Sequence, residues 1–337
     1  MTIKYPSIEQ FKSIIKKVAQ DTRCAGSDER GYPIYNQNPL PTLNFIGTCK
    51  IHGSNGGVRY SKDGELVAQS RERDLSLLSD NHGFCAFVFK NEKFFRELAE
   101  FLIGENDQVI IYGEWFGNGI NNNVAVNQLS KRFAIFGIRF IKNEESFWYD
   151  TFGLDYWFGD FIEELNAHDV YVITQFGSWD FEIDFNRPEM IQNRLIEITN
   201  EIERECPVGK YFGISGTGEG IVLSCNEQRF YQFKSKGTLH SNTKVKTLNP
   251  VDEELLRGAR EFADNFVTEA RLQQGIEVMK SEMLLEPIPA NTGAFIKWIV
   301  NDIFKEEQEN MLTNNLNPKN VAREIGTLAR IWYLNYI

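Results

Sequence analysis

Apolar and polar residues alternate differently in the two parts of this 337-residue chain. Up to about residue 245, runs with a period of two, typical of strands, are mixed with stretches whose apolar residues recur every three or four positions, typical of helices. The predicted strands cover residues 43–51, 57–60, 66–69, 108–115, 132–141, 220–224 and 229–234. The predicted helices cover residues 7–20, 91–103 and 188–205, the first with Ser7 as its N-cap. A loop rich in Gly, Pro, Asn and Asp is expected at residues 21–41, and a turn at 62–64.

The strand pattern disappears after Pro250. Helical spacing continues through residues 251–280, 293–308 and 320–336, and these stretches are separated by Pro287, Pro289 and Pro318. The length of the chain also favours two domains. We therefore predict an α+β fold, with a mixed domain at residues 1–245 and a small all-helical domain at residues 250–337.

Composition and charge narrow the classes of function. The formal net charge is −11, which disfavours a general nucleic-acid binder held by a bulk positive field, so phosphate contacts would have to come from a local basic surface. The N-terminus lacks a signal-peptide pattern, and no apolar run approaches the roughly 18 to 20 residues that span a bilayer. The five cysteines are an odd number without paired spacing, which favours reduced thiols and no zinc site. We expect a cytoplasmic protein without a membrane partner.

The first candidate for chemistry is a lysine at the end of a predicted strand. Lys50 opens the sequence Lys-Ile-His-Gly-Ser-Asn-Gly-Gly, whose glycines would let a phosphate group approach the backbone closely. Such a lysine can be an ordinary hairpin residue in solvent or a nucleophilic amine. A nucleophile would need neighbouring cations or partial burial, because a lysine with the ordinary pKa of about 10.4 is charged at pH 7. The motif alone does not decide between the two.

A second basic element could supply those cations. In Tyr-Gln-Phe-Lys-Ser-Lys, at residues 231–236, strand alternation places Lys234 and Lys236 on one face. The pair can be an exposed strand face or a grip on a phosphate group. Lys244 and Lys246 extend the basic stretch, which makes it the best candidate for a local nucleic-acid surface.

Two carboxylates, an arginine and a phenylalanine are further candidates. Glu114 and Glu219 each lie among glycine and apolar residues, so each is either a buried structural group or a ligand for a sugar hydroxyl or a metal ion. Arg71 is either a surface residue or a fork that binds phosphate. Phe136 is either a core residue or a ring that stacks on a ligand.

Taken in order along the chain, these elements resemble the covalent nucleotidyltransferase superfamily of ATP-dependent ligases and messenger-RNA capping enzymes. The order is Lys-x-His-Gly, Arg, Gly-Glu-Trp-Phe-Gly, Phe-x-Ile-Phe, Glu-Gly-Ile-Val-Leu and Lys-x-Lys. His52, in place of the usual Asp of the first motif, and the Asn55 that follows it resemble the RNA ligase 2 family of phages and kinetoplastid RNA editing. The resemblance implies an ATP-grasp-like nucleotidyltransferase domain of antiparallel sheets with flanking helices, followed by the helical C-terminal domain.

The resemblance also implies a reaction. Lys50 would attack the α-phosphorus of ATP and carry AMP, which then passes to a 5′-phosphate end that is joined to a 3′-hydroxyl. The catalytic group would be Lys50, His52, Glu219, Lys234 and Lys236. The nucleotide would be held by Lys50, Ile51, Asn55, Arg71, Glu114, Phe136, Glu219, Lys234 and Lys236. Glu219 would also bind a metal ion, Mg²⁺ or Mn²⁺.

Individual roles follow from the same resemblance. Glu114 would bind the ribose hydroxyl, Phe136 would stack on adenine, and Arg71 would contact ribose or the polynucleotide phosphate. Two positions depart from the pattern of the relatives. Cys49 precedes the lysine where several relatives carry an acidic residue, and Gly137 follows the phenylalanine where relatives often carry Asp. Both departures concern contacts to the base.

The expected partners are ATP and RNA ends, or a nicked duplex that contains RNA, and the expected state is a monomer. One alternative is a DNA ligase or a capping-type nucleotidyltransferase, which generally append a β-barrel domain; the helical C-terminal region and His52 disfavour both. The other alternative is a catalytically inactive relative that only binds nucleic acid. The presence of all the chemical positions from Lys50 to Lys236 disfavours it.

Overall fold

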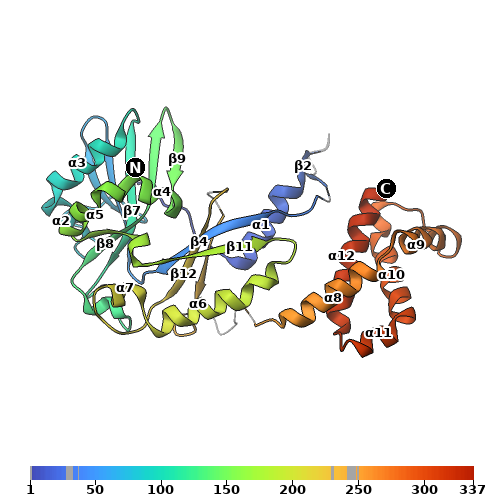
Figure 1. The fold of residues 1–337 in the computed structure, drawn as a ribbon. Helices are drawn as coiled ribbons and strands as arrows, with labels where there is room; N and C mark the ends of the chain where they lie inside the picture. The colour runs from blue at the N-terminus through green and yellow to red at the C-terminus, as the bar shows by residue number, and fades with distance from the viewer. Residues whose placement is uncertain (1, 28–32, 37, 229–230, 241–247, 249) are drawn as a thin grey trace. The chain divides into compact units, whose positions relative to one another are not determined.

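The chain folds into a mixed α+β structure, described by a computed structural model for residues 2–27, 33–36, 38–228, 231–240, 248 and 250–337. It divides into two compact units (Figure 1). The first comprises Met1–Gln20 and Leu40–Asn249, and the second comprises Asp21–Pro39 and Pro250–Ile337. The predicted α+β class is confirmed: the first unit contains largely antiparallel sheets with helices, and the C-terminal region is helical.

Two sheets form the framework of the first unit. The five-stranded sheet has the order β1–β13–β12–β4–β11, and the six-stranded sheet has the order β10–β8–β7–β5–β6 with β9 beside β8. The first sheet consists of β1 (Glu9–Gln10), β4 (Thr42–Lys50), β11 (Ser178–Asp184), β12 (Gly220–Cys225) and β13 (Gln232–Lys236). The second consists of β5 (Ser54–Ser61), β6 (Leu66–Ser70), β7 (Gln108–Phe116), β8 (Arg132–Lys142), β9 (Glu145–Tyr149) and β10 (Val170–Val172). Neighbouring strands are antiparallel except for β1 with β13 and β10 with β8.

Helices pack against both sheets. Helix α3 packs against β5 and β7, and α6 packs against β12 and β13 (Figure 1). The α-helices of this part of the chain are α1 (Phe11–Arg23), α2 (Phe84–Lys90), α3 (Glu92–Ile103), α4 (Thr151–Phe158), α5 (Ile162–Ala167), α6 (Gln192–Arg204) and α7 (Pro207–Tyr211). Short 3₁₀ turns are η1 (Ala125–Gln128), η2 (Gly159–Phe161), η3 (Ile173–Phe176) and η4 (Pro188–Ile191).

Strand β7 is buried on both faces. Val109 and Ile111 belong to the main core, which runs through both sheets. Ile110 and Tyr112, on the opposite face, form a smaller cluster with Tyr5. The N-terminal segment therefore covers part of the outer face of the six-stranded sheet, where Ile110 and Tyr112 would otherwise expose apolar surface to water.

The first predicted helix begins later than expected. Helix α1 starts at Phe11 rather than after Ser7. Residues 9–10 form β1 instead, because they pair in parallel with Phe233 and Lys234 of β13. A pairing between the two ends of the domain overrides the local helical spacing, which a sequence pattern does not reveal.

Other predicted boundaries also need correction. The expected loop at residues 21–41 contains the end of α1 and two paired strands, β2 (Cys24–Ser27) and β3 (Pro33–Tyr35). Helix α2 was not predicted, and the helix expected at 188–205 divides into η4 and α6. The strand expected at 229–234 is β13 at Gln232–Lys236, and Arg229 lies outside the described residues.

The described C-terminal part of the second unit consists of helices. They are α8 (Glu253–Phe266), α9 (Glu269–Ser281), α10 (Thr292–Glu306), α11 (Gln308–Thr313) and α12 (Pro318–Tyr336), with the 3₁₀ turn η5 (Pro289–Asn291). The helix predicted at 251–280 is interrupted, because the side chain of Thr268 caps α9 by accepting from the backbone of Arg271. The core of this unit includes Phe295 of α10 and Tyr333 of α12, whose ring centroids lie 4.6 Å apart.

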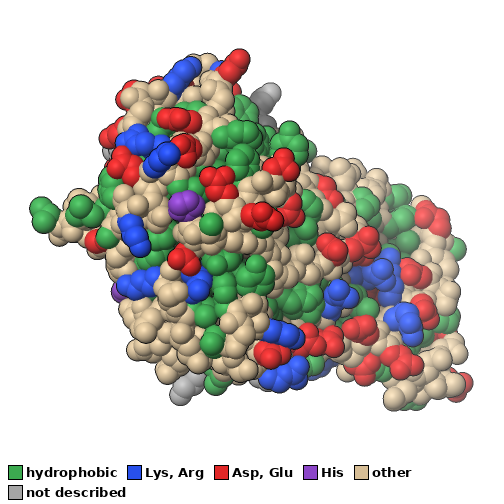
Figure 2. All heavy atoms as spheres, turned by 60° about the vertical axis from the view of Figure 1, so that its left-hand side comes forward, with side chains coloured by type: hydrophobic (Ala, Val, Ile, Leu, Met, Phe, Trp, Pro, Cys, Tyr) green, Lys and Arg blue, Asp and Glu red, His purple; other side chains and the backbone are tan. Residues whose placement is uncertain are grey.

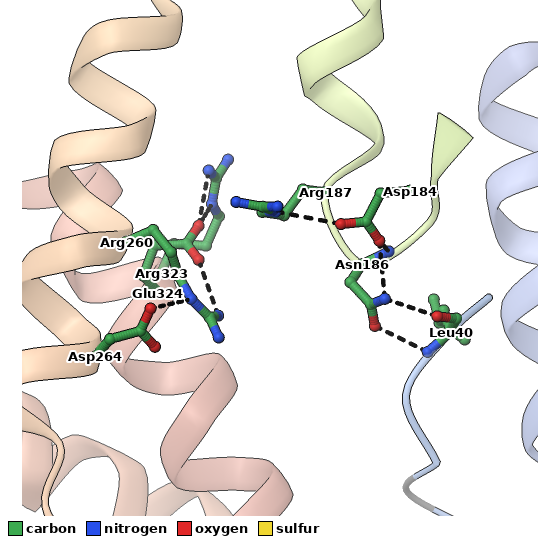
Figure 3. A network of polar contacts seen from close by, with 8 residues as sticks. All are labelled: Leu40, Asp184, Asn186, Arg187, Arg260, Asp264, Arg323 and Glu324. Carbon is green, nitrogen blue, oxygen red and sulfur yellow. Dashed lines mark hydrogen bonds and ion pairs between the residues drawn. The ribbon is translucent and has the colours of Figure 1, made fainter. Parts of the chain in front are cut away.

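Polar contacts connect neighbouring segments within each unit (Figure 3). In the first unit, Asn186 exchanges hydrogen bonds with the backbone of Leu40 and donates to Asp184, which ties the segment before β4 to the end of β11. In the second unit, the nearly buried carboxylate of Glu324 accepts from Arg323 at 3.0 Å and pairs with Arg260 at 3.5 Å. Buried carboxylates require such partners.

Within the described residues, none of the helices combines the length and the apolar composition needed to cross a bilayer. All five cysteines are free thiols, and four of them are buried.

Candidate active site

Lys50 and Lys236 lie on the same face of the five-stranded sheet, on either side of β12. In the strand register Lys50 of β4 is opposite Gly220, and Gly220 is opposite Lys236 of β13. Lys234 stands two positions before Lys236 and therefore faces the same side. Strand alternation predicted that Lys234 and Lys236 share one face. The structure shows that Lys50, from a strand distant in sequence, lies on that face as well.

Gly220, between the two lysines, cannot carry a side chain. Its φ is +147°, and a Cβ atom there would lie 2.1 Å from the backbone oxygen of Ser235. Only glycine adopts this conformation without strain. Glycine is therefore required for β12 to enter the sheet directly after Glu219.

Three basic side chains converge on the carboxylate of Glu219. Lys50 Nζ donates to Oε2 at 2.7 Å, and Nδ1 of His52 lies 3.2 Å from the same oxygen. Lys236 Nζ pairs with Oε1 at 2.6 Å. The Glu219 side chain is only 1% exposed, whereas those of Lys50 and His52 are 20% and 33% exposed. A buried carboxylate with three basic partners holds those partners around one point.

The surrounding charges fix the protonation state of Glu219. Burial alone would raise the pKa of its carboxyl, but the hydrogen bond to His52 and the charges of Lys50 and Lys236 hold that pKa well below the usual range. The pKa of Lys234 is lowered, first by burial and then by the charges of the neighbouring lysines. Cations are therefore crowded at this edge of the sheet, and an anion bound there would offset their repulsion.

Glu114 faces the same region from β7 of the other sheet. Its Oε1 accepts a hydrogen bond of 3.1 Å from the backbone N–H of Gly53. A Cβ atom at Gly53 would lie 2.5 Å from the backbone oxygen of Trp115, so glycine permits this close approach. Burial raises the pKa of Glu114 to about 7, with Lys50 opposing and Glu219 adding to the rise. Near pH 7 this carboxyl is therefore present in both its neutral and its ionised form.

A pocket of about 520 Å³ opens beside Lys50 within the first unit. Seven of the expected nucleotide-binding residues line it: Lys50, Ile51, Asn55, Arg71, Glu114, Phe136 and Lys234. The other expected residues, His52, Glu219 and Lys236, are not part of its lining and connect to it through the ion pair between Glu219 and Lys50. The lining combines apolar side chains with four ionisable residues of the expected set, which suits a ligand with a planar apolar part and an anionic part.

The N-terminal segment makes three contacts at this pocket that the sequence patterns did not reveal. The backbone oxygen of Ile8 accepts from Lys234 Nζ at 2.9 Å, and Ser7 Oγ accepts from the Arg71 guanidinium at 2.9 Å. The Tyr5 ring meets Phe136 edge to face, with centroids 4.9 Å apart. These contacts form between segments that are distant in sequence, so the local sequence of residues 5–8 does not predict them.

A buried hydrogen-bond network holds Tyr5 in place. Its hydroxyl donates to Gln232 Oε1 at 3.1 Å, and the Gln232 amide donates to Asp150 at 2.9 Å and to Ser224 at 3.2 Å. Gly137 is part of the fit, because a Cβ atom there would lie 3.0 Å from the Tyr5 ring. The glycine after Phe136, which departs from the resemblance, thus makes room for Tyr5.

The surface carries no single basic field on the face shown in Figure 2, where Lys and Arg are interspersed with Asp and Glu. This mixture agrees with the net charge of −11. Lys244 and Lys246, the expected extension of the basic stretch, lie outside the described residues. Within the described first unit, the pocket lining and the surroundings of Glu219 bring together Lys50, Lys234 and Lys236.

Comparison with known proteins identifies the family. Residues 43–246 match the RNA ligase family, which is more than half of the chain, and the chain belongs to that family. A search of curated proteins found no match. The structure of a Naegleria gruberi RNA ligase with pyrophosphate is similar at a TM-score of 0.47 and 15% identity, over 71% of this chain and 57% of that one. A mutant of that ligase with ATP and Mn gives a TM-score of 0.46 at 15% identity, with the same shares covered.

An archaeal ATP-dependent RNA ligase gives a TM-score of 0.38 at 11% identity, over 98% of this chain and 66% of that one. The chain therefore spans less than two thirds of the length of the chain in each of these three solved structures.

Proposed function

We propose that this protein is an ATP-dependent RNA ligase that carries AMP on Lys50 and joins a 3′-hydroxyl to a 5′-phosphate end. Membership of the RNA ligase family supports the general class. The observation that carries the specific proposal is the convergence of Lys50, Lys236 and His52 on Glu219, at the edge of a pocket that Phe136 also lines. This arrangement supports the proposal because it places an amine, cations that would bind phosphate and an aromatic ring within one site.

In the proposed first step, Lys50 Nζ forms a bond to the α-phosphorus of ATP, and the bond from that phosphorus to the bridging oxygen of pyrophosphate breaks. The lysine must first lose its proton and its hydrogen bond to Glu219. Lys234 and Lys236 would neutralise charge on the phosphates, because they share the face of Lys50. AMP then moves to the 5′-phosphate end, and the 3′-hydroxyl displaces it.

The remaining pocket residues have proposed roles in holding the nucleotide. Phe136 would stack on the base and Glu114 would accept from a ribose hydroxyl. Arg71 and Asn55 would contact phosphate or ribose, since both line the pocket beside Lys50. Ile51, which is 5% exposed, would bound the site beside the base. These roles fit the lining, which pairs apolar surface with charged groups.

A divalent cation, Mg²⁺ or Mn²⁺, is part of the proposal. Among the described residues no group of three or more His, Cys, Asp or Glu is suited to hold a metal ion alone. The ionised carboxylate of Glu219 is paired with Lys50, His52 and Lys236, so it would hold a cation in place of one of these partners. Such a cation would take its other ligands from nucleotide phosphates and water, as Mg²⁺ commonly does. When bound, it would supply charge neutralisation at the phosphates.

We further propose that residues 1–245 perform the transfer of AMP and that residues 250–337 help to hold the RNA. The whole described lining of the pocket lies in the first unit. The helical second unit has its own core. RNA ends or a nicked duplex that contains RNA would be the substrate, with ATP, and the protein would act as a monomer.

The test is a labelling experiment. The protein is incubated with α-labelled ATP and Mg²⁺, denatured, and examined for label that is labile to acid and stable to alkali, as a phosphoramidate is. Label in the wild type that is lost in Lys50→Ala supports the proposal. Label from GTP instead would indicate a capping-type enzyme, and absence of label from any nucleotide would indicate an inactive nucleic-acid-binding protein. Sealing of nicks with RNA or DNA at the 3′-end then separates an RNA ligase from a DNA ligase.

A further inference from the structure

Two exposed leucines form the end of a turn beside the pocket. After β6 the chain folds back on itself, and Leu75 is buried at 8% exposure. Leu77 is 66% exposed and Leu78 is completely exposed. We call these two residues the Leu77–Leu78 tip. The leucine before the tip belongs to the core, so the tip itself is what reaches into solvent.

Hydrogen bonds give the tip a defined shape. Ser76 and Ser79 exchange backbone hydrogen bonds of 3.3 and 3.0 Å, so the Leu77–Leu78 tip occupies the two central positions of a tight turn. The Arg73 guanidinium donates to the backbone oxygen of Ser79 at 2.7 Å and of Asp80 at 3.2 Å. The hydrogen bonds from Arg73, which precedes the turn in sequence, therefore stabilise its conformation.

Turn chemistry does not explain the two leucines. The central positions of tight turns favour Gly, Asn, Asp, Pro or Ser, whose side chains or backbone freedom stabilise the turn. Leucine offers neither, and adjacent exposed leucines present apolar surface to water. Two adjacent leucines held in a fixed shape offer a compact apolar surface that a bound partner would cover.

Both ends of the turn are attached to the wall of the nucleotide pocket. Arg71 and Arg73, before the tip, line the pocket, and so does Asn81 after it. The amide of Asn81 donates to Ser54 Oγ at 2.7 Å, at the start of β5. A strand end whose phosphate reaches Lys50 would therefore have its neighbouring nucleotides close to the tip.

We propose that the Leu77–Leu78 tip packs against the sugars and base edges of an RNA duplex beside the strand break. This inference rests on the proposed function, since that function places a polynucleotide end at the pocket. Charge favours nucleic acid over a protein partner, because Arg71, Lys50 and Lys234 of the same pocket supply cations for the adjoining phosphates. Apolar side chains that meet base steps and sugars in a shallow groove are an established way of holding nucleic acid.

The experiment measures binding of a nicked RNA duplex by fluorescence anisotropy at several salt concentrations. In the double variant Leu77→Ser, Leu78→Ser, Kd rises about tenfold, because the apolar area that the duplex covers is lost. The slope of log Kd against log salt stays that of the wild type, because no phosphate contact is removed. The variant Leu77→Met, Leu78→Met keeps Kd within about twofold, because methionine conserves apolar volume.

A matched control is Tyr156→Ser. Tyr156 is 85% exposed and is not part of the pocket lining, so its loss removes comparable apolar surface elsewhere and leaves Kd unchanged. Melting curves of all variants check that the fold is retained. Self-adenylylation is measured in parallel and stays at the wild-type level in the double serine variant.

Three outcomes would overturn the inference. One is an unchanged Kd in the double serine variant. Another is a reduced salt slope, which would mean that the change acts through lost phosphate contacts. The third is a dimer in the wild type that becomes a monomer in the variant, which would make the tip an interface between copies. If the wild-type protein takes no label from ATP, the proposed function is refuted. If the wild type is labelled but the double serine variant binds RNA with unchanged Kd, only the proposed role of the Leu77–Leu78 tip is refuted.

Discussion

Lys50 Nζ donates to Glu219 Oε2 at 2.7 Å, and the same carboxylate pairs with Lys236 on its other oxygen. The proposed nucleophile is therefore held by a buried anion before any nucleotide arrives. The pairing keeps the amine at the edge of the pocket, and its release is required before the amine can attack. Glu219 is in this view a positioning group as well as the proposed site for a metal ion.

Lys50→Arg tests whether the amine itself is needed. Arginine preserves the positive charge and can still pair with Glu219, but its guanidinium does not lose its proton in proteins. We expect self-adenylylation to vanish while the melting temperature changes little. The matched control is Lys62→Arg, at an exposed turn after β5, which should label like the wild type. Persistent label on the Lys50→Arg protein would place the nucleophile elsewhere.

Glu219→Gln tests the buried ion-pair cluster through stability. The amide leaves Lys50 and Lys236 without a counter-charge, and we expect a loss of about 2 to 3 kcal/mol in the free energy of unfolding, measured by urea denaturation in metal-free buffer at pH 7. That figure is below the loss for a fully buried pair, because both ammonium groups still reach solvent.

The pH dependence of this effect has a definite sign. The folded pKa of Glu219 lies below its unfolded value, so its stabilisation is complete above an unfolded pKa of about 4.3 and is lost as pH falls below it. The stability of the wild type should therefore fall more steeply than that of Glu219→Gln below about pH 4.3. Parallel curves for the two proteins would contradict a strongly paired carboxylate.

The raised pKa of Glu114 leads us to expect that nucleotide binding depends on pH near neutrality. Its pKa is raised to about 7, so the group is largely a neutral acid at pH 6 and a carboxylate at pH 8. A carboxylate accepts from a ribose hydroxyl more strongly than a neutral acid does. The KM for ATP in self-adenylylation should therefore fall as pH rises through 7, and this fall should be absent in Glu114→Gln. A variant that keeps the same pH profile would assign the titration to another group.

The same raised pKa affects stability in the opposite direction to that of Glu219. Between an unfolded pKa of about 4.3 and the folded value of about 7, the folded protein binds the extra proton. Its contribution to stability is therefore complete below the unfolded pKa and declines as pH rises across this interval. Urea denaturation of the wild type and Glu114→Gln at pH 5 and pH 7 measures the difference.

Tyr5→Ala tests the contribution of the N-terminal segment. Removing the ring takes away the edge-to-face contact with Phe136, and we expect the KM for ATP to rise about five- to tenfold with a smaller change in kcat. Tyr5→Phe keeps the ring and loses only the hydrogen bond to Gln232, so its KM should stay near the wild-type value. Tyr60→Phe, which loses a comparable hydrogen bond to Glu100, serves as control. An unchanged KM in Tyr5→Ala would restrict Tyr5 to a structural role.

Removal of the chain from Pro250 onwards tests the proposed division of labour. The described pocket lining lies in the first unit, so the shortened protein should still label itself with AMP. Sealing of a nicked duplex should fall on the order of a hundredfold, because a second binding unit raises the effective concentration of the substrate. A folded truncated protein that takes no label would show that the second unit is needed for the first step.

Local sequence predicted the class of fold, which the structure confirms, and named most residues of the candidate site. Apolar periodicity distinguished the sheet-rich part from the helical part. Strands repeat every two residues and helices about every 3.6, and both periods can be read from residues that are close in sequence. Short local motifs also drew attention to four candidate site residues. Each lies in a predicted strand or beside a glycine: Lys50, Glu219, Lys234 and Lys236. The proposed roles of these residues remain predictions.

Only the tertiary structure decided how these residues meet. The register of three strands places Lys50 and Lys236 on either side of Gly220. The sequence of one segment does not specify which distant segment it will pair with. The pairing of residues 9–10 with β13 brought Ile8 to Lys234, against a local pattern that predicted helix. Side-chain periodicity is a property of neighbours in sequence, whereas convergence on one carboxylate depends on which strands the folded chain places side by side.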